Sequence, residues 1–257
     1  NVVVDHYLIN AKWHTEIKKS INDVIVIDDL ANKRINCDFL ININPIFKKK
    51  NYLKNNKNKK CKYFIGTNFF PIFDLKKNKN NFFKNNFNKY IFISFGGACE
   101  LAFYKNFLIL LSYINIKKIY FIMTFIGTND EAKIIKYYIK KYNLRIKLLI
   151  NNYNINDFIR KSFFCIGSGG ITSWERYYFN KYSLIIKTAN NQNKNIQYLK
   201  SKRIISYIGN SQEFKKKSFV KRFINNFNEI YFIQSKFLKK PRLKGKLEYL
   251  FNKIENK

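Results

Sequence analysis

The chain of 257 residues (31.0 kDa) has room for one large domain or two of ordinary size, and its hydrophobic content of 46% is enough for a globular core. Lys and Arg number 49 against 16 Asp and Glu, and the resulting net charge of +33 ordinarily points to nucleic acid or an anionic surface. Specific nucleic-acid binding is disfavoured, because the excess is nearly all lysine in scattered runs that match an AT-rich codon bias. The charge should still attract anionic substrates.

The first part of the chain contains four short apolar runs that predict strands. Val2 to Val4 is a β-branched run whose carboxyl end carries His6 and Tyr7. A polar helix is expected around Thr15 to Ser20, and Lys48 to Lys60 is expected to be a surface loop. The four strands are predicted at Val2 to Val4, Val24 to Ile27, Cys37 to Asn42 and Cys61 to Gly66. Their alternation with helices or loops indicates a mostly parallel sheet.

A second α/β unit starts cleanly at Tyr90. Six strands are expected there, at Tyr90 to Phe95, Ile119 to Met123, Arg145 to Ile150, Phe163 to Ile166, Leu184 to Ile186 and Ile204 to Tyr207. The helices between them are expected at Leu101 to Tyr113, Glu131 to Tyr142, Ile155 to Lys161 and up to Leu199. Terminal helices should follow over the last fifty residues. This is the pattern of a nucleotide-binding α/β domain.

The polar stretch between the two parts predicts a domain boundary. We expect a first Rossmann-like domain at residues 1–75, a linker at 76–89, a nucleotide-binding Rossmann-like domain at 90–240, and a C-terminal helix at 241–257 that packs back on the first domain. The chain begins directly on a strand and its sole methionine is Met123. The front of the gene product, and with it part of the first domain, is therefore expected to be missing.

The segment from Ile166 to Tyr178 has the strongest functional pattern in the chain. It runs from a buried strand through Gly167-Ser168-Gly169-Gly170 into a helix that carries Thr172 and Glu175. A helix start presents unpaired N–H groups and glycines allow close approach of an anion, so this pattern is typical of phosphate binding. Hydroxyl groups add donors, and Glu175 is placed to accept from ribose hydroxyls. Glycine turns between strand and helix also occur without a ligand, so both interpretations stay open.

Other polar residues lie where α/β proteins place ligands. Gly96-Gly97 also follows a strand, and the two glycine segments together would suit a diphosphate, although neither is a Walker motif. His6 is equally compatible with a hydrogen-bonded strand end, and Asn191-Gln192 with a helix start. Asp28 and Asp29 are adjacent on a strand and face opposite ways, so at most one can serve a given site.

The four cysteines and two histidines give no metal-binding spacing, and the cysteines lie in or beside apolar runs, as reduced core residues do. No apolar run reaches the ~18 to 20 residues of a membrane span, and no signal peptide is visible. We therefore expect a cytoplasmic protein without a metal or cofactor.

Several motifs in order resemble the PseG family, the UDP-sugar hydrolase of pseudaminic acid biosynthesis and flagellin glycosylation. They are Val3-Val4-Asp5-His6-Tyr7, Val26-Ile27-Asp28-Asp29-Leu30-Ala31-Asn32, Cys37-Asp38, Ile93-Ser94-Phe95-Gly96-Gly97, Gly167-Ser168-Gly169-Gly170 with Thr172 and Trp174-Glu175-Arg176, and Asn191-Gln192. The resemblance runs roughly from Val2 to Gly209. It implies a GT-B-like fold of two Rossmann-like domains, related to the glycosyltransferase that makes lipid II.

The activity that this resemblance implies is metal-free, inverting hydrolysis of UDP-2,4-diacetamido-2,4,6-trideoxy-β-L-altropyranose to UDP and the free sugar. On the family pattern Tyr7 and Asn191 are the catalytic candidates in this chain. The predicted substrate-binding residues are His6, Gly97, Ser168, Gly169, Gly170, Thr172, Glu175 and Gln192. A small-molecule UDP-sugar would be the partner of a monomer, with no cofactor.

The chain also departs from the family pattern. The family's catalytic histidine lies in a Gly-x-Gly-His loop that does not occur in this sequence, and Phe69-Phe70-Pro71-Ile72-Phe73 stands where an arginine is usual. Ala98-Cys99-Glu100 follows Gly97 in place of an aspartate or asparagine region. Two alternatives therefore stay open: a GT-B glycosyltransferase with a UDP-sugar donor, and a UDP-binding protein that has lost catalysis.

Overall fold

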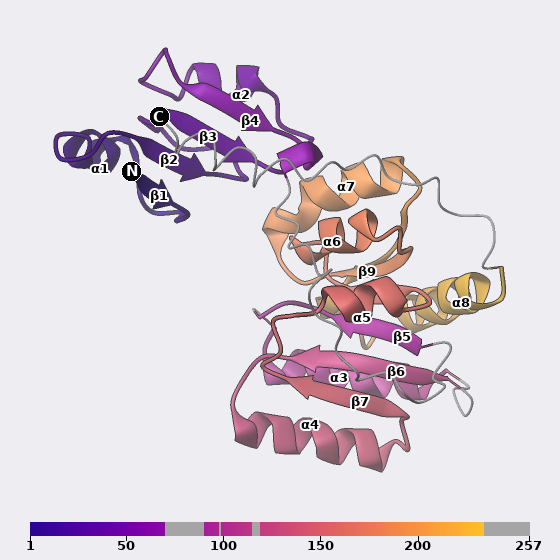
Figure 1. The fold of residues 1–257 in the computed structure, drawn as a ribbon. Coiled ribbons are helices and arrows are strands. Elements are labelled where there is room, and N and C mark those ends of the chain that lie inside the picture. The colour runs from indigo at the N-terminus through magenta and orange to yellow at the C-terminus, as the bar shows by residue number, and fades with distance from the viewer. Residues whose placement is uncertain (70–89, 98, 115–118, 234–257) are drawn as a thin grey trace. The chain divides into compact units, whose positions relative to one another are not determined.

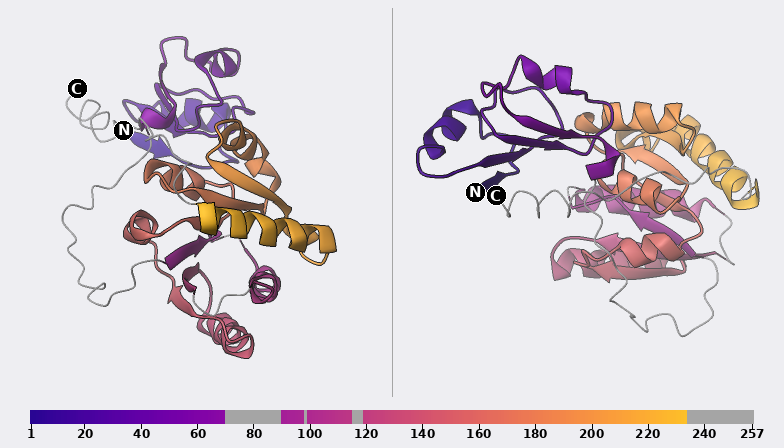
Figure 2. Two further views of the ribbon diagram at one scale, coloured as in Figure 1. Left: turned by 90° about the vertical axis from the view of Figure 1, so that its right-hand side faces the viewer. Right: turned by 45° about the horizontal axis from the view of Figure 1, so that its top comes forward.

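The computed structural model describes residues 1–69, 90–97, 99–114 and 119–233. The chain divides into two compact units, whose described parts are residues 1–69 (unit 1) and the described residues from 90 to 233 (unit 2). Both are α/β units, and every strand pair in these described parts is parallel (Figures 1 and 2). The predicted fold class is thereby confirmed. The boundaries of the predicted linker and C-terminal helix stay predictions, because residues 76–89 and 241–257 lie outside the described residues.

Unit 1 is a four-stranded sheet in the sequential order β1-β2-β3-β4. Its elements are β1 (Val2–Val4), α1 (Ala11–Ile17), β2 (Val24–Ile27), β3 (Phe39–Asn42), α2 (Lys49–Leu53), β4 (Lys62–Ile65) and the short 3₁₀ helix η1 (Thr67–Phe69). Alternate residues of the strands pack on opposite faces, as the pleat requires. Val24, Val26 and Leu40 join one buried cluster, and Ile25 and Ile41 join the other.

Two local predictions in unit 1 were wrong in part. The segment expected to be a surface loop, Lys48 to Lys60, contains α2, because Tyr52 is buried and its hydroxyl donates to the main-chain oxygen of Asp28 at 2.9 Å. A tertiary contact thus holds a helix that the local Lys-Asn sequence does not signal. Helix α1 begins at Ala11, earlier than expected, because the Asn10 side chain accepts from the Lys12 N–H at 3.0 Å and caps it.

Unit 2 is a six-stranded sheet in the order β10-β9-β8-β5-β6-β7. Its strands are β5 (Tyr90–Ser94), β6 (Tyr120–Phe125), β7 (Ile146–Ile150), β8 (Cys165–Gly167), β9 (Ser183–Lys187) and β10 (Ile205–Asn210). Its helices are α3 (Leu101–Ser112), α4 (Asn129–Lys141), α5 (Asn156–Lys161), α6 (Thr172–Tyr178), α7 (Asn193–Ser201) and α8 (Lys217–Ile233), with 3₁₀ turns η3 (Asn190–Gln192) and η4 (Ser211–Glu213). The chain first adds β6 and β7 on one side of β5 and then crosses to add β8, β9 and β10 on the other side. This is a doubly wound sheet.

The core of unit 2 lies on both faces of this sheet. Helices α3, α4 and α8 bury their apolar sides against one face, where Phe107, Ile135 and Phe223 belong to one cluster with strand residues such as Phe121. Helix α5 covers the opposite face with Ile159, which joins a cluster formed by Tyr90, Phe92, Ile122 and Cys165 of the strands. Because both faces are covered, the strands read as near-continuous apolar runs, which made them predictable.

Candidate functional site

The glycine turn lies at the point of the doubly wound sheet where the order of strand addition reverses. Strands β5 and β8 are neighbours, with Ser94 paired to Gly167 at their carboxyl ends. Gly96-Gly97 follows β5, and Ser168 to Gly170 follows β8 and leads into α6. The two glycine segments therefore leave the sheet from adjacent strands at the same edge. The crevice at such a switch point is where open α/β sheets bind ligands.

The three glycines of the turn have different surroundings. A Cβ at Gly167 would collide with the Ser94 carbonyl oxygen and with the Arg176 guanidinium, whose Cζ would lie at 2.9 Å. A Cβ at Gly169 would lie 2.8 Å from Cδ1 of Ile196 on α7. At Gly170 the nearest atom would be Oγ of Ser168 at 3.8 Å, an ordinary contact. Packing thus requires glycine at 167 and 169, and only Gly170 leaves open space beside the main chain.

Gln192 braces the turn from the neighbouring loop. Its Oε1 accepts from the N–H of Gly169 at 3.2 Å and from the N–H of Thr188 at 3.1 Å, while its Nε2 donates to the Thr188 hydroxyl at 2.9 Å. The predicted ligand-binding amide is therefore already engaged with the turn. The structure gives Gln192 a positioning role whether or not it also contacts a ligand.

Arg176 connects the turn to the sheet by hydrogen bonds. Its guanidinium is fully buried and donates to the carbonyl of Ser94 at 3.3 Å and to the carbonyl of Ser168. Burial lowers the pKa of this guanidinium, and the neighbouring Cys165 and Glu175 partly offset that effect. A buried arginine with two main-chain acceptors fixes both strand ends at once. The sequence showed Arg176 in the motif but gave no indication of this role.

The remaining predicted residues of unit 2 gather around the same turn. The Ser168 hydroxyl donates to the Phe95 carbonyl at 3.1 Å, which leaves its oxygen as an acceptor. Glu175 is partly buried, and desolvation raises the pKa of its carboxyl, opposed by Arg176. Thr172 is the first residue of α6, and Asn191 is exposed on η3. The structure thus brings Gly97, Ser168, Gly169, Gly170, Thr172, Glu175, Asn191 and Gln192 to one edge of unit 2.

The predicted residues of unit 1 form a separate group at the carboxyl ends of β1 and β2. The exposed Tyr7 donates its hydroxyl to Oδ2 of Asp29 at 3.3 Å, and His6 is exposed, with Nδ1 accepting from the N–H of Leu8. Asp28 is buried and accepts from the Tyr52 hydroxyl at 3.0 Å. The two aspartates therefore face different surroundings. The pKa of Asp29 is raised mainly by burial and further by the charge of Asp28. The pKa of Tyr7 is raised mainly by burial and further by the charge of Asp29.

Tyr52 and Ile196 are site-supporting residues that sequence reasoning missed. Tyr52 holds Asp28 from a segment that reads as a loop, and Ile196 fills the space over Gly169 from a helix more than twenty residues away. For Tyr52 the only signal in the sequence was an aromatic residue within a polar stretch. Among the described residues no group of three potential metal ligands occurs, and none of their helices is long and apolar enough to cross a membrane.

The fold is that of a two-unit α/β protein of the GT-B type, and comparison with solved structures supports this fold class. The match to MurG of Acinetobacter baumannii covers 96% of this chain and 76% of the MurG chain, with a TM-score of 0.60 and 7% sequence identity. The match to the S. aureus MnaA–UDP co-structure covers 95% of this chain and 77% of the MnaA chain, with a TM-score of 0.57 and 13% sequence identity. At these identities the likeness shows the fold alone.

Other similar structures are matched over a smaller part of their length. The chain spans 37% and 59% of the protein in two structures of the spinosyn rhamnosyltransferase SpnG, the second at a TM-score of 0.50 and 7% identity. The sequence matches no family model and no curated protein.

Proposed function

We propose that this protein acts on a nucleotide sugar, with unit 2 binding the nucleoside diphosphate at the glycine turn. The observation that carries the proposal is the placement of two glycine segments at the switch point between β5 and β8, with open main chain at Gly170. The co-structure of the similar MnaA with UDP supports UDP as the nucleotide. Glu175, one turn into α6, is the proposed acceptor for the ribose hydroxyls.

Within this proposal the reaction is hydrolysis, as the resemblance to the PseG family implies. Water attacks the anomeric carbon and releases one proton to the solvent, the bond from that carbon to the diphosphate oxygen breaks, and its electron pair leaves with UDP. The charge that develops on the diphosphate would be stabilised by the N–H groups and dipole at the glycine turn. Tyr7 and Asn191 are the proposed sugar-side residues, and the diacetamido-trideoxy-altropyranose is the proposed sugar.

A glycosyltransferase is the competing function, because SpnG is named as a rhamnosyltransferase and shares the fold. The same diphosphate cradle would serve a transferase, which hands the sugar to an acceptor other than water. Incubation of the complete gene product with the UDP-sugar and no acceptor separates the two functions. Free sugar should appear with every turnover of a hydrolase and only slowly with a transferase.

Calorimetric titration of UDP into the complete gene product tests the binding part, with AMP as the control nucleotide. We expect micromolar, base-selective binding, and at least a tenfold loss in Gly170→Val, because its side chain would occupy the space that an anion needs. Gly169→Val is less informative, since its side chain would collide with Ile196 without any ligand. Equal binding of both nucleotides, or normal UDP binding by a folded Gly170→Val variant, would overturn the proposal.

A further inference from the structure

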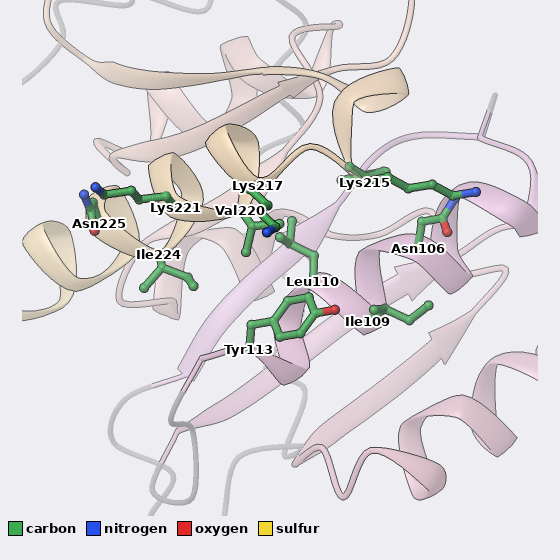
Figure 3. Close-up of a pocket in the computed structure, with 11 residues that line it drawn as sticks. Asn106, Ile109, Leu110, Tyr113, Lys215, Lys217, Val220, Lys221, Ile224 and Asn225 are labelled. Carbon is green, nitrogen blue, oxygen red and sulfur yellow. The ribbon is translucent and has the colours of Figure 1, made fainter.

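A groove between α3 and α8 lies apart from the glycine turn, and no residue of the turn lines it. Its volume is about 510 Å³. One wall consists of Asn106, Ile109, Leu110 and Tyr113 from α3 and its last turn, a spacing of 3, 1 and 3 that defines one helix face. Figure 3 shows this face opposite α8, whose Val220 and Ile224 point toward it.

Helix α3 has apolar side chains on the face that packs into the core of unit 2 and also on a second face. Tyr104, Phe107, Leu108 and Leu111 are buried in the core of unit 2. Ile109 and Tyr113 lie on a different face, and Tyr113 is 58% exposed. A helix that is hydrophobic all round is normally covered on every side. Here the second face lines a groove instead, which leaves apolar surface available to a ligand.

The rim of the groove on the α8 side is cationic. Lys215, Lys217 and Lys221 line it, are exposed, and have no carboxylate at ion-pair distance among the described residues. Their neighbours in sequence differ: Lys216 and Arg222 both approach Glu213, at 3.6 and 3.8 Å. Within the part of the chain that the structure describes, no acidic side chain lines the groove. Three lysines around an apolar floor therefore leave a positive potential that an anionic head group would neutralise.

We propose that this groove binds a single-chain amphiphilic anion, with an alkyl body against α3 and α8 and a phosphate head group at the lysine rim formed by Lys215, Lys217 and Lys221. Its volume lies within the ~300 to 1,000 Å³ typical of small-molecule sites, which are mostly apolar with a few placed polar groups. Ile109, Val220 and Ile224 supply apolar contact for the alkyl chain, and the lysine ammonium groups supply charge-assisted hydrogen bonds to phosphate. The site is independent of the nucleotide site proposed above.

Titration of dodecyl phosphate, below its micellar concentration, into the 257-residue chain tests this site. We expect saturable one-to-one binding, no binding of inorganic phosphate, and at least about tenfold weaker binding of dodecyl maltoside, which has the same chain and no charge. Equal affinity for the charged and the neutral amphiphile would overturn the anionic specificity. No saturable binding of dodecyl phosphate would overturn the site itself.

Two variants locate the binding. Lys217→Gln/Lys221→Gln should weaken dodecyl phosphate binding about tenfold, because both ammonium groups are lost from the rim. Lys216→Gln is the matched control, since that lysine approaches Glu213 and does not line the groove. Ile224→Ser should weaken the binding of both amphiphiles by shortening the apolar wall. An equal loss in the control, or no loss in the double variant, would contradict the placement.

Discussion

Polar residues follow β1 in unit 1 and β8 in unit 2, but the two loops are held very differently. In unit 2 Ser168 and Gln192 are buried, and their side chains bond to main-chain groups of the surrounding loops. In unit 1 Tyr7 is 58% and Leu8 84% exposed, and the Tyr7 hydroxyl has one long hydrogen bond to Asp29. The glycine turn is therefore shaped before any ligand arrives, whereas the β1 loop keeps its polar groups in water.

This difference indicates how binding energy would be used in each unit. A turn whose backbone is already held by buried side chains loses little conformational entropy when it binds an anion. A loop whose side chains are exposed must order them on binding. Each unit contains one tryptophan, Trp13 in unit 1 and Trp174 in unit 2, so the two can be monitored separately by fluorescence.

Arg176→Ala should have the largest effect on unit 2. It leaves the carbonyls of Ser94 and Ser168 without their buried donor and opens a cavity, so we expect the free energy of unfolding to fall by about 4 kcal/mol. Urea unfolding followed by Trp174 fluorescence in a Trp13→Phe background measures this. Arg222→Ala, an exposed arginine, should stay within about 0.5 kcal/mol. A loss below about 1 kcal/mol in Arg176→Ala would mean that the turn does not depend on this brace.

Gly167→Ala should destabilise unit 2 almost as strongly. Its Cβ would meet a main-chain oxygen, which cannot move aside as a side-chain tip can, so we expect a loss of about 3 kcal/mol. Gly170→Ala is the matched control three residues on, because its Cβ meets nothing closer than 3.8 Å. Similar stability for the two variants, by the same Trp174 measurement, would show that the turn is not tightly packed.

Unit 1 should respond to acid instead, through His14. This ring is fully buried, its Nδ1 accepts from the Asn36 N–H at 3.2 Å, and burial with help from Lys33 and Lys18 lowers its pKa from 6.5 to about 4. The unfolded chain then binds more protons, so stability present above pH 6.5 is lost as the pH falls toward 4. The shift corresponds to roughly 3 kcal/mol.

Urea unfolding of unit 1 at several pH values, followed by Trp13 fluorescence in a Trp174→Phe background, measures this loss. His14→Gln should remove most of the pH dependence between 6.5 and 4, since the variant has no ring to protonate there. The exposed His6 supplies the control, and His6→Gln should keep the acid sensitivity of the parent. If both variants lose the same stability in acid as the parent, His14 is not the responsible group.

The fold was largely predictable because apolar β-branched runs separated by glycine or polar turns mark buried parallel strands. The glycine turn after β8 was located for the same reason. Its supports were not predictable, because they come from distant parts of the chain: Ser168 bonds to Phe95, and Arg176 to Ser94. Helix α2 was missed because a buried tertiary contact of Tyr52, and no local pattern, holds it.

The smallest expected effect concerns Glu175, where stability and UDP affinity should change in opposite directions. Desolvation raises the pKa of its carboxyl, so the stability associated with the protonated form is lost as the pH rises through the folded-state value. Glu175→Gln, which cannot ionise, should therefore be slightly more stable at pH 7, by less than about 1 kcal/mol. The same variant should bind UDP about tenfold more weakly if the carboxylate holds the ribose, because a charged hydrogen bond is lost. Gain of stability with unchanged UDP affinity would reduce Glu175 to a partly buried helix residue without a role in binding. Gain of stability with loss of affinity would show a carboxylate kept for binding at the expense of the fold.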